Sequence, residues 1–122
     1  MENETVTKTV DLKHRMYVWT LGIVKMVDGL NQMTSNDVIA RQIIRSGTSV
    51  CANYVEGQAA SSKKDFINYL HISLKSANES KYWLALLRDL KKVDVKKIEP
   101  LLEELQEISN ILPSSLITLK RK

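Results

Sequence analysis

SGTSVCANYVEG, residues Ser46–Gly57, has the residue spacing of a helix but keeps a glycine, Gly47, in its interior. A glycine inside a helix costs about 1 kcal/mol relative to alanine, so we expect a neighbouring helix to approach closely at Gly47. The second glycine, Gly57, stands where helices often end in a left-handed residue, and we predict that it terminates this helix. A helix shaped for close approach is typical of a helical bundle.

Length and composition favour one all-α domain. The chain has 122 residues with only four Gly and two Pro, so long elements with few breaks are expected. No run approaches the roughly 18 apolar residues of a membrane span, and the polar N-terminus lacks the apolar core of a signal peptide. The single Cys51 cannot form an internal disulfide, which fits the reducing cytoplasm. We interpret Cys51 as a small buried residue rather than a nucleophile.

Apolar residues recur every three or four positions along most of the chain, which is the spacing of helices. We expect helices at about residues 10–32, 37–56, 62–90 and from 99 onward, the last after a short turn at 95–98. Pro100 suits the first turn of the fourth helix, and Pro113 should kink or split it. Short loops force neighbouring helices to run antiparallel. The prediction is an up-down-up-down four-helix bundle over residues 10–122, preceded by a flexible segment at 1–9.

The polar residues of the second and third predicted helices should face each other in this arrangement. If the connecting loop marks the centre of the hairpin, Glu79 lies opposite Arg41. Gln42 and Arg45 are within one turn of that position. We interpret this set as a structural network across the helix pair. A catalytic carboxylate pair is the alternative, although nothing in the sequence marks a substrate pocket beside it.

Glu56 raises a separate question of charge. It stands near the C-terminal end of its helix, where the helix dipole opposes a carboxylate. We therefore expect a compensating partner, either Lys63 or the first free backbone amides of the third helix. Lys64 follows Lys63 and also lies opposite Glu56 in this arrangement. Asn53 could bridge the same turn between the two helices.

Motifs for metal, cofactor or catalytic chemistry are not evident. Di-iron bundles use two Glu-x-x-His motifs, whereas this chain has only His14 and His71, with Asp11-x-x-His14 as one imperfect match. No phosphate-binding glycine loop or nucleophile elbow occurs in the sequence. We expect no enzyme activity, no cofactor and no metal, and we place both histidines at a surface or an interface.

Two long stretches resemble a known family. RQIIRSGTSVCANYVEG, from Arg41, and SSKKDFINYLHISLKSANESKYWLALL, from Ser61, are similar to the bacterial four-helix-bundle proteins encoded in 23S ribosomal RNA intervening sequences. VDLKHRMYVWTLGIVK, from Val10, resembles the opening helix of that family. The resemblance implies structural motif positions at Arg41, Arg45, Gly47, Ser49, Asn53, Glu56, Gly57, Glu79, Tyr82 and Trp83.

The resemblance also implies a non-enzymatic homo-oligomer, commonly a pentamer. Related accessory proteins of diversity-generating retroelements bind nucleic acid and a reverse transcriptase. Our leading hypothesis is therefore a protein that binds RNA or DNA, with a nucleic-acid-processing protein as a further partner. The net charge of +4 permits this. The candidate binding residues gather at one end of the predicted bundle: Lys63, Lys64, Lys120, Arg121 and Lys122.

Two further patterns bear on partners. The fourth predicted helix carries an acidic stretch that could dock a basic protein: Glu99, Glu103, Glu104 and Glu107. A protein-interaction scaffold without nucleic-acid binding is therefore the alternative hypothesis. The first and third predicted helices hold more large aromatic residues than one small core needs: Tyr17, Trp19, Tyr69, Tyr82 and Trp83. Some of them should be exposed and form the interface of an oligomer.

Overall fold

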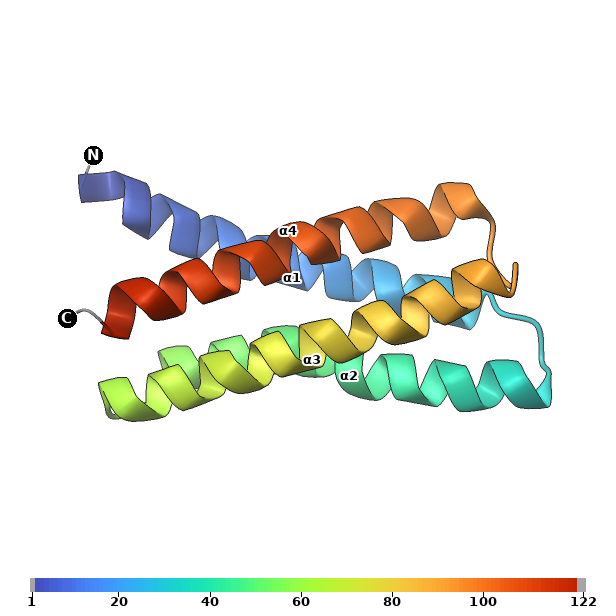
Figure 1. Cartoon of the computed structure of the whole chain (residues 1–122), viewed down its shortest axis with the longest axis horizontal. Helices are drawn as coiled ribbons and strands as arrows, with labels where there is room; N and C mark the ends of the chain where they lie inside the picture. The colour runs from blue at the N-terminus through green and yellow to red at the C-terminus, as the bar shows by residue number, and fades with distance from the viewer. Residues whose placement is uncertain (1, 121–122) are drawn as a thin grey trace.

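The computed structural model of the chain is an all-α four-helix bundle, as predicted. It describes the backbone of residues 2–120 and the side chains of residues 12–116, and the described backbone contains no strand. The helices are α1 (Glu2–Asp28), α2 (Thr34–Gln58), α3 (Lys63–Asp89) and α4 (Val95–Lys120). Successive helices run in opposite directions, so the α1–α2 and α3–α4 loops lie at the same end of the molecule (Figure 1).

One hydrophobic core runs along the bundle. α1 packs against α2 and α4, and α3 packs against the same two helices. All four helices contribute fully buried side chains, among them Met16, Ile23, Ile43, Val50, Leu70, Leu84, Leu105 and Leu112. Trp19 is also buried, and its indole Nε1 donates a hydrogen bond to the Leu101 carbonyl at 2.9 Å. This bond satisfies a buried donor and ties α1 to α4.

Both ends of α1 and both ends of α2 differ from the predicted ones. α1 begins at Glu2, not near Val10, and ends at Asp28. α2 begins at Thr34 and ends at Gln58, so it is longer than expected at both ends. That residues 1–9 form a flexible segment outside the bundle stays a prediction.

The start of α4 corrects the predicted role of Pro100. The helix begins at Val95 and continues through both prolines. Asp94 Oδ1 accepts a hydrogen bond from the Lys96 amide at 2.9 Å, and Ile98 is fully buried, so the first turn is capped and docked before Pro100 is reached. Pro113 does not split α4, because Leu112 and Leu116 on either side of it are buried.

The close approach predicted at Gly47 is confirmed. Gly47 is buried in α2, and a Cβ placed on it would lie 3.3 Å from Ile23 Cγ2 and 3.6 Å from the Trp19 ring. The missing side chain therefore lets α2 approach the large residues of α1. The helix-propensity penalty of Gly47 is offset by this packing.

The predicted left-handed conformation at Gly57 is wrong. All four glycines lie within the described backbone, and none has a positive φ. Gly57 is inside α2, where an added Cβ would lie only 2.9 Å from Tyr69 Cβ and 3.0 Å from Phe66 Cδ1. Space, not backbone conformation, requires a glycine here. The left-handed residue that follows a helix is Lys91, with φ 57°, just after α3.

Several other expectations can be compared directly with the structure. Cys51 is buried, and burial raises the pKa of its thiol, which confirms its interpretation as a core residue. Tyr17 and Tyr82 are 57% and 62% exposed, whereas Trp19 belongs to the core and Trp83 is partly buried against it. No helix in the described part of the chain is both long and apolar enough to cross a membrane.

Candidate functional site

The seam between α2 and α3 is lined by small hydroxyl side chains. Three contacts follow one another along it: Ser46 Oγ to Ser80 Oγ at 2.9 Å, Ser49 Oγ to Ser76 Oγ at 2.9 Å, and Ser73 Oγ donating to the Val50 carbonyl at 2.7 Å. Small side chains let the two helix backbones approach, and the hydrogen bonds satisfy polar groups that would otherwise be buried without partners. The seam is therefore a structural device of the bundle.

At the outer edge of this seam lies a polar cluster centred on Glu79. Glu79 Oε2 accepts hydrogen bonds from Trp83 Nε1, at 3.0 Å, and from Arg45 Nη2. Gln42 Oε1 in turn accepts from Arg45 Nε and Nη2, at 3.2 and 2.9 Å. The Trp83 hydrogen bond, followed by Arg45, lowers the pKa of Glu79. The carboxylate is thus held in its charged form by structural partners.

The predicted contact between Glu79 and the Arg41–Arg45 stretch is confirmed at Arg45. The predicted position opposite Arg41 is wrong by about one helical turn. The contacts of Ser46 with Ser80 and of Ser49 with Ser76 fix the register, and they set Glu79 beside Arg45, one turn further along α2 than Arg41. Arg41 is exposed and makes no ion pair with any described side chain.

The predicted contacts of Glu56 and Asn53 are not formed. Glu56 is exposed, and no ion pair joins it to Lys63 or Lys64 in the described structure. Its helix continues for two further residues, so the carboxylate stays in solvent beside the last turn. Asn53 Nδ2 donates instead to the carbonyl and hydroxyl oxygens of Ser49, at 2.9 and 2.7 Å, one turn back on the same helix.

The predicted basic end is only partly described. Lys63 and Lys64 form the first turn of α3 and are exposed. Neither makes an ion pair among the described side chains. The side chain of Lys120, and Arg121 and Lys122 altogether, lie outside the described residues. The structure therefore places two of the five side chains of this candidate site.

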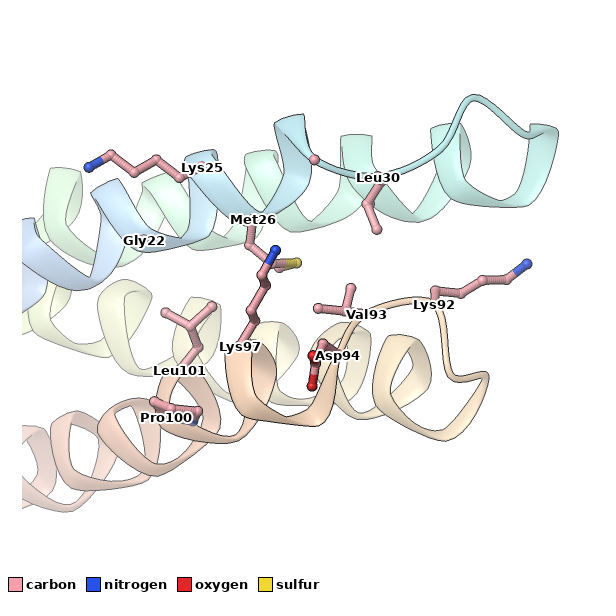
Figure 2. A pocket seen from close by; sticks show the side chains of 11 residues that line it. Gly22, Lys25, Met26, Leu30, Lys92, Val93, Asp94, Lys97, Pro100 and Leu101 are labelled. Carbon is pink, nitrogen blue, oxygen red and sulfur yellow. The ribbon is translucent and has the colours of Figure 1, made fainter.

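A cleft of about 500 Å³ lies between the end of α1, the α3–α4 loop and the start of α4. Met26, Leu30, Val93 and Leu101 supply apolar lining (Figure 2). Figure 2 shows the Lys97 amine reaching across the cleft toward Met26. The cleft residues include neither a histidine nor a pair of carboxylates, and their one acid, Asp94, caps α4. The other charged groups of the lining are three lysines, Lys25, Lys92 and Lys97.

Ion pairs divide the acidic stretch of α4. Arg15 Nε donates to Glu104 Oε2 at 2.9 Å, and Arg15 Nη2 donates to Glu104 Oε1 at 2.6 Å. This two-point ion pair joins α1 to α4. Glu99 lies 3.7 Å from Arg88 of α3. Glu103 and Glu107 are exposed, without an ion pair to any described side chain.

Sequence reasoning missed the outward face of α3. Six exposed residues recur on it every three or four positions: Lys64, Asn68, His71, Lys75, Asn78 and Tyr82. This spacing places them on one stripe of the helix. The signal was available in the sequence as a polar and basic stripe with helical period. His14 is also exposed, so both histidines lie at the surface as predicted, and no metal-binding group of three or more His, Cys, Asp and Glu occurs among the described side chains.

Comparison with known proteins identifies relatives of this chain in sequence and fold. The sequence model of the family described as 23S rRNA-intervening sequence protein matches residues 8–114. A crystal structure of a protein of unknown function from the S23 ribosomal protein family of Bacteroides thetaiotaomicron VPI-5482 is similar, with a TM-score of 0.83 and 36% identity. The match covers 89% of this chain and 97% of that chain. No match was found among curated protein sequences.

Proposed function

Since the chain belongs to the 23S rRNA-intervening sequence protein family, we propose that it is a non-enzymatic homo-oligomer that binds nucleic acid. The observation that carries the proposal is the exposed Lys63–Lys64 pair, which makes no ion pair with any described side chain, although the exposed Asp65 follows it in the same turn. The pair lies in the first turn of α3, where the helix dipole adds partial positive charge and favours phosphate. Lys120, Arg121 and Lys122 would extend this basic end, since Figure 1 draws the end of α4 on the same side as the start of α3.

Assembly would strengthen such binding. Tyr17, Val18 and Leu21 form an exposed apolar patch on α1, and patches of this kind commonly mark interfaces between proteins. We propose a cyclic homo-oligomer, most simply a pentamer. Each chain carries a net charge of +4, so a ring would add up phosphate contacts and bind with strong salt dependence.

A role without catalysis fits the polar groups of the bundle. The Glu79 carboxylate is occupied by Trp83 and Arg45, and the Cys51 thiol is buried with a raised pKa. A buried free thiol also agrees with a location in the reducing cytoplasm. A nucleic-acid-processing protein is a further candidate partner.

One observation favours a second function. Glu103 and Glu107 are exposed on α4 and lack an ion pair within the described structure. These carboxylates would repel phosphate and attract a basic protein. A protein-interaction scaffold without nucleic-acid binding is therefore the alternative function.

A salt series separates the two functions. The protein is titrated into labelled structured RNA and duplex DNA, with Lys63→Gln/Lys64→Gln compared against Lys25→Gln/Lys96→Gln, which removes the same charge from exposed sites elsewhere. Each lost phosphate contact should flatten the plot of log affinity against log salt by roughly 0.9 on duplex DNA. We expect the flatter plot for Lys63→Gln/Lys64→Gln and for a triple variant of Lys120, Arg121 and Lys122. The oligomer mass of these variants should be unchanged. If the intact protein binds neither RNA nor DNA at low salt, nucleic-acid binding is refuted and the protein-interaction scaffold remains as the function.

A further inference from the structure

The outward stripe of α3 carries positive charge without negative charge. Lys64 and Lys75 lie on it with His71 between them, and all three are exposed. No Asp or Glu is among its six members. The stripe runs from Lys64 to Tyr82, and a rise of 1.5 Å per residue makes it about 27 Å long.

Two acids of α3 lie beside the stripe: Asp65 is exposed next to Lys64, and Glu79 is bound by other side chains. Glu79 lies one turn after Lys75, close enough for the positive charge of Lys75 to help lower the pKa of Glu79. Its Oε2 atom accepts from Arg45 and Trp83, both on the side of the α2–α3 seam. Arg45 thereby balances the charge of Glu79, and the lysines of the stripe remain available.

The stripe ends in an exposed aromatic ring. Tyr82 is 62% exposed, although a tyrosine ring normally gains by burial. Its ring packs against that of Trp83 with centroids 4.9 Å apart and planes at 73°. The near-perpendicular contact orients the Tyr82 ring and leaves most of the residue in solvent.

We propose that the outward face of α3 is a track for single-stranded nucleic acid. Lys64 and Lys75 would contact backbone phosphates, the side-chain amides of Asn68 and Asn78 would reach sugars or base edges, and a base would stack on Tyr82. The choice of a single strand follows from Tyr82, because only an unstacked base can lie on an aromatic side chain. This inference rests on the proposed nucleic-acid binding and names its surface and ligand class.

The test compares strands and variants by fluorescence anisotropy in a salt series. The probes are labelled oligo(U) RNA, oligo(dT) DNA and a DNA duplex of the same length, so the first two also separate RNA from DNA. The variants are Tyr82→Ala, Tyr82→Phe and Lys75→Gln, with Lys96→Gln as the control that removes one exposed lysine elsewhere. Circular dichroism and light scattering of each variant report its fold and its oligomer mass.

We expect intact protein to bind both single strands, and Tyr82→Ala to weaken that binding by roughly tenfold, the usual effect of losing one stacked base. Tyr82→Phe keeps the ring and should bind as the intact protein does. Lys75→Gln should flatten the salt dependence by roughly 0.7 on a single strand, and Lys96→Gln should not.

The contrary results distinguish failure of the α3 track from failure of the proposed nucleic-acid binding. Single-strand binding that is unchanged in Tyr82→Ala and Lys75→Gln overturns the track but leaves the proposed function. Tighter binding of the duplex than of either single strand likewise overturns the track but leaves the proposed function. A drop in oligomer mass in Tyr82→Ala identifies this face as an interface between copies and also overturns the track. Failure of the intact protein to bind either single strand overturns the track. Failure to bind structured RNA and duplex DNA as well overturns the proposed function.

Discussion

Two glycines with equally close neighbours should respond oppositely to alanine. A Cβ on Gly57 would lie 2.9 Å from Tyr69 Cβ, and a Cβ on Gly22 would lie 2.9 Å from Leu101 Cδ2. Tyr69 Cβ is bonded directly to the backbone of α3, so it can move only if the helix moves. The Leu101 methyl is the far end of a flexible side chain and can rotate away.

The expected magnitudes follow from this difference. Overpacking against a rigid neighbour costs about 1–3 kcal/mol, and alanine regains up to about 1 kcal/mol of helix propensity. Gly57→Ala should therefore lower the free energy of unfolding by about 1–2 kcal/mol. Gly22→Ala should leave it unchanged or raise it by up to about 1 kcal/mol, because the propensity gain is opposed only by a rotamer change.

The assay is urea unfolding followed by circular dichroism, at one protein concentration because assembly would couple stability to concentration. Gly29→Ala is the control, since its Cβ would meet only carbonyl oxygens of its own turn at 3.5 and 3.8 Å. A Gly57→Ala variant as stable as the original protein would show that α3 gives way. Equal losses in Gly57→Ala and Gly22→Ala would refute the distinction between rigid and flexible neighbours.

Three further predictions concern single sites. Gly47→Leu should destabilise by about 1–3 kcal/mol beyond any helix-propensity effect, because even a Cβ added at this position would lie 3.3 Å from Ile23 Cγ2; a neutral thermal melt would contradict the close crossing. Lys91→Gly should raise stability by up to about 1 kcal/mol, because glycine adopts the φ of 57° without strain; a lower melting temperature would contradict this. The folded-state pKa of Glu79 lies below its ordinary value of 4.5, so its contribution is present above pH 4.5 and lost as pH falls through the lowered pKa. Glu79→Gln should therefore flatten the acid limb of the stability profile, and an unchanged limb would contradict the network.

The helical bundle could be predicted from the sequence because its signals are local. Apolar residues at helical spacing define the four buried faces, and a glycine inside an apolar helix, as at Gly47, indicates close packing whatever the partner is. The link between Glu79 and Arg45 was also within reach, because an antiparallel hairpin restricts which turns can face each other. An excess of aromatic residues over what one core can hold predicted that some of them are exposed, and the structure shows that these are Tyr17 and Tyr82.

Only the tertiary structure decided the register, the helix ends and the choice of partners. Gly57 looks like a helix terminator in sequence, but contact with Phe66 and Tyr69 keeps it helical and moves the end of α2. The contacts of Ser46 with Ser80 and of Ser49 with Ser76 set the hairpin register about a turn away from the predicted one, so Arg45 and not Arg41 meets Glu79. Burial of Ile98 likewise starts α4 before Pro100. The local preference at Gly57 is about 1 kcal/mol and a proline inside a helix costs about 3 kcal/mol. Burying each large side chain contributes about 1.5–3 kcal/mol, so the packing of several side chains between distant segments overrides these preferences.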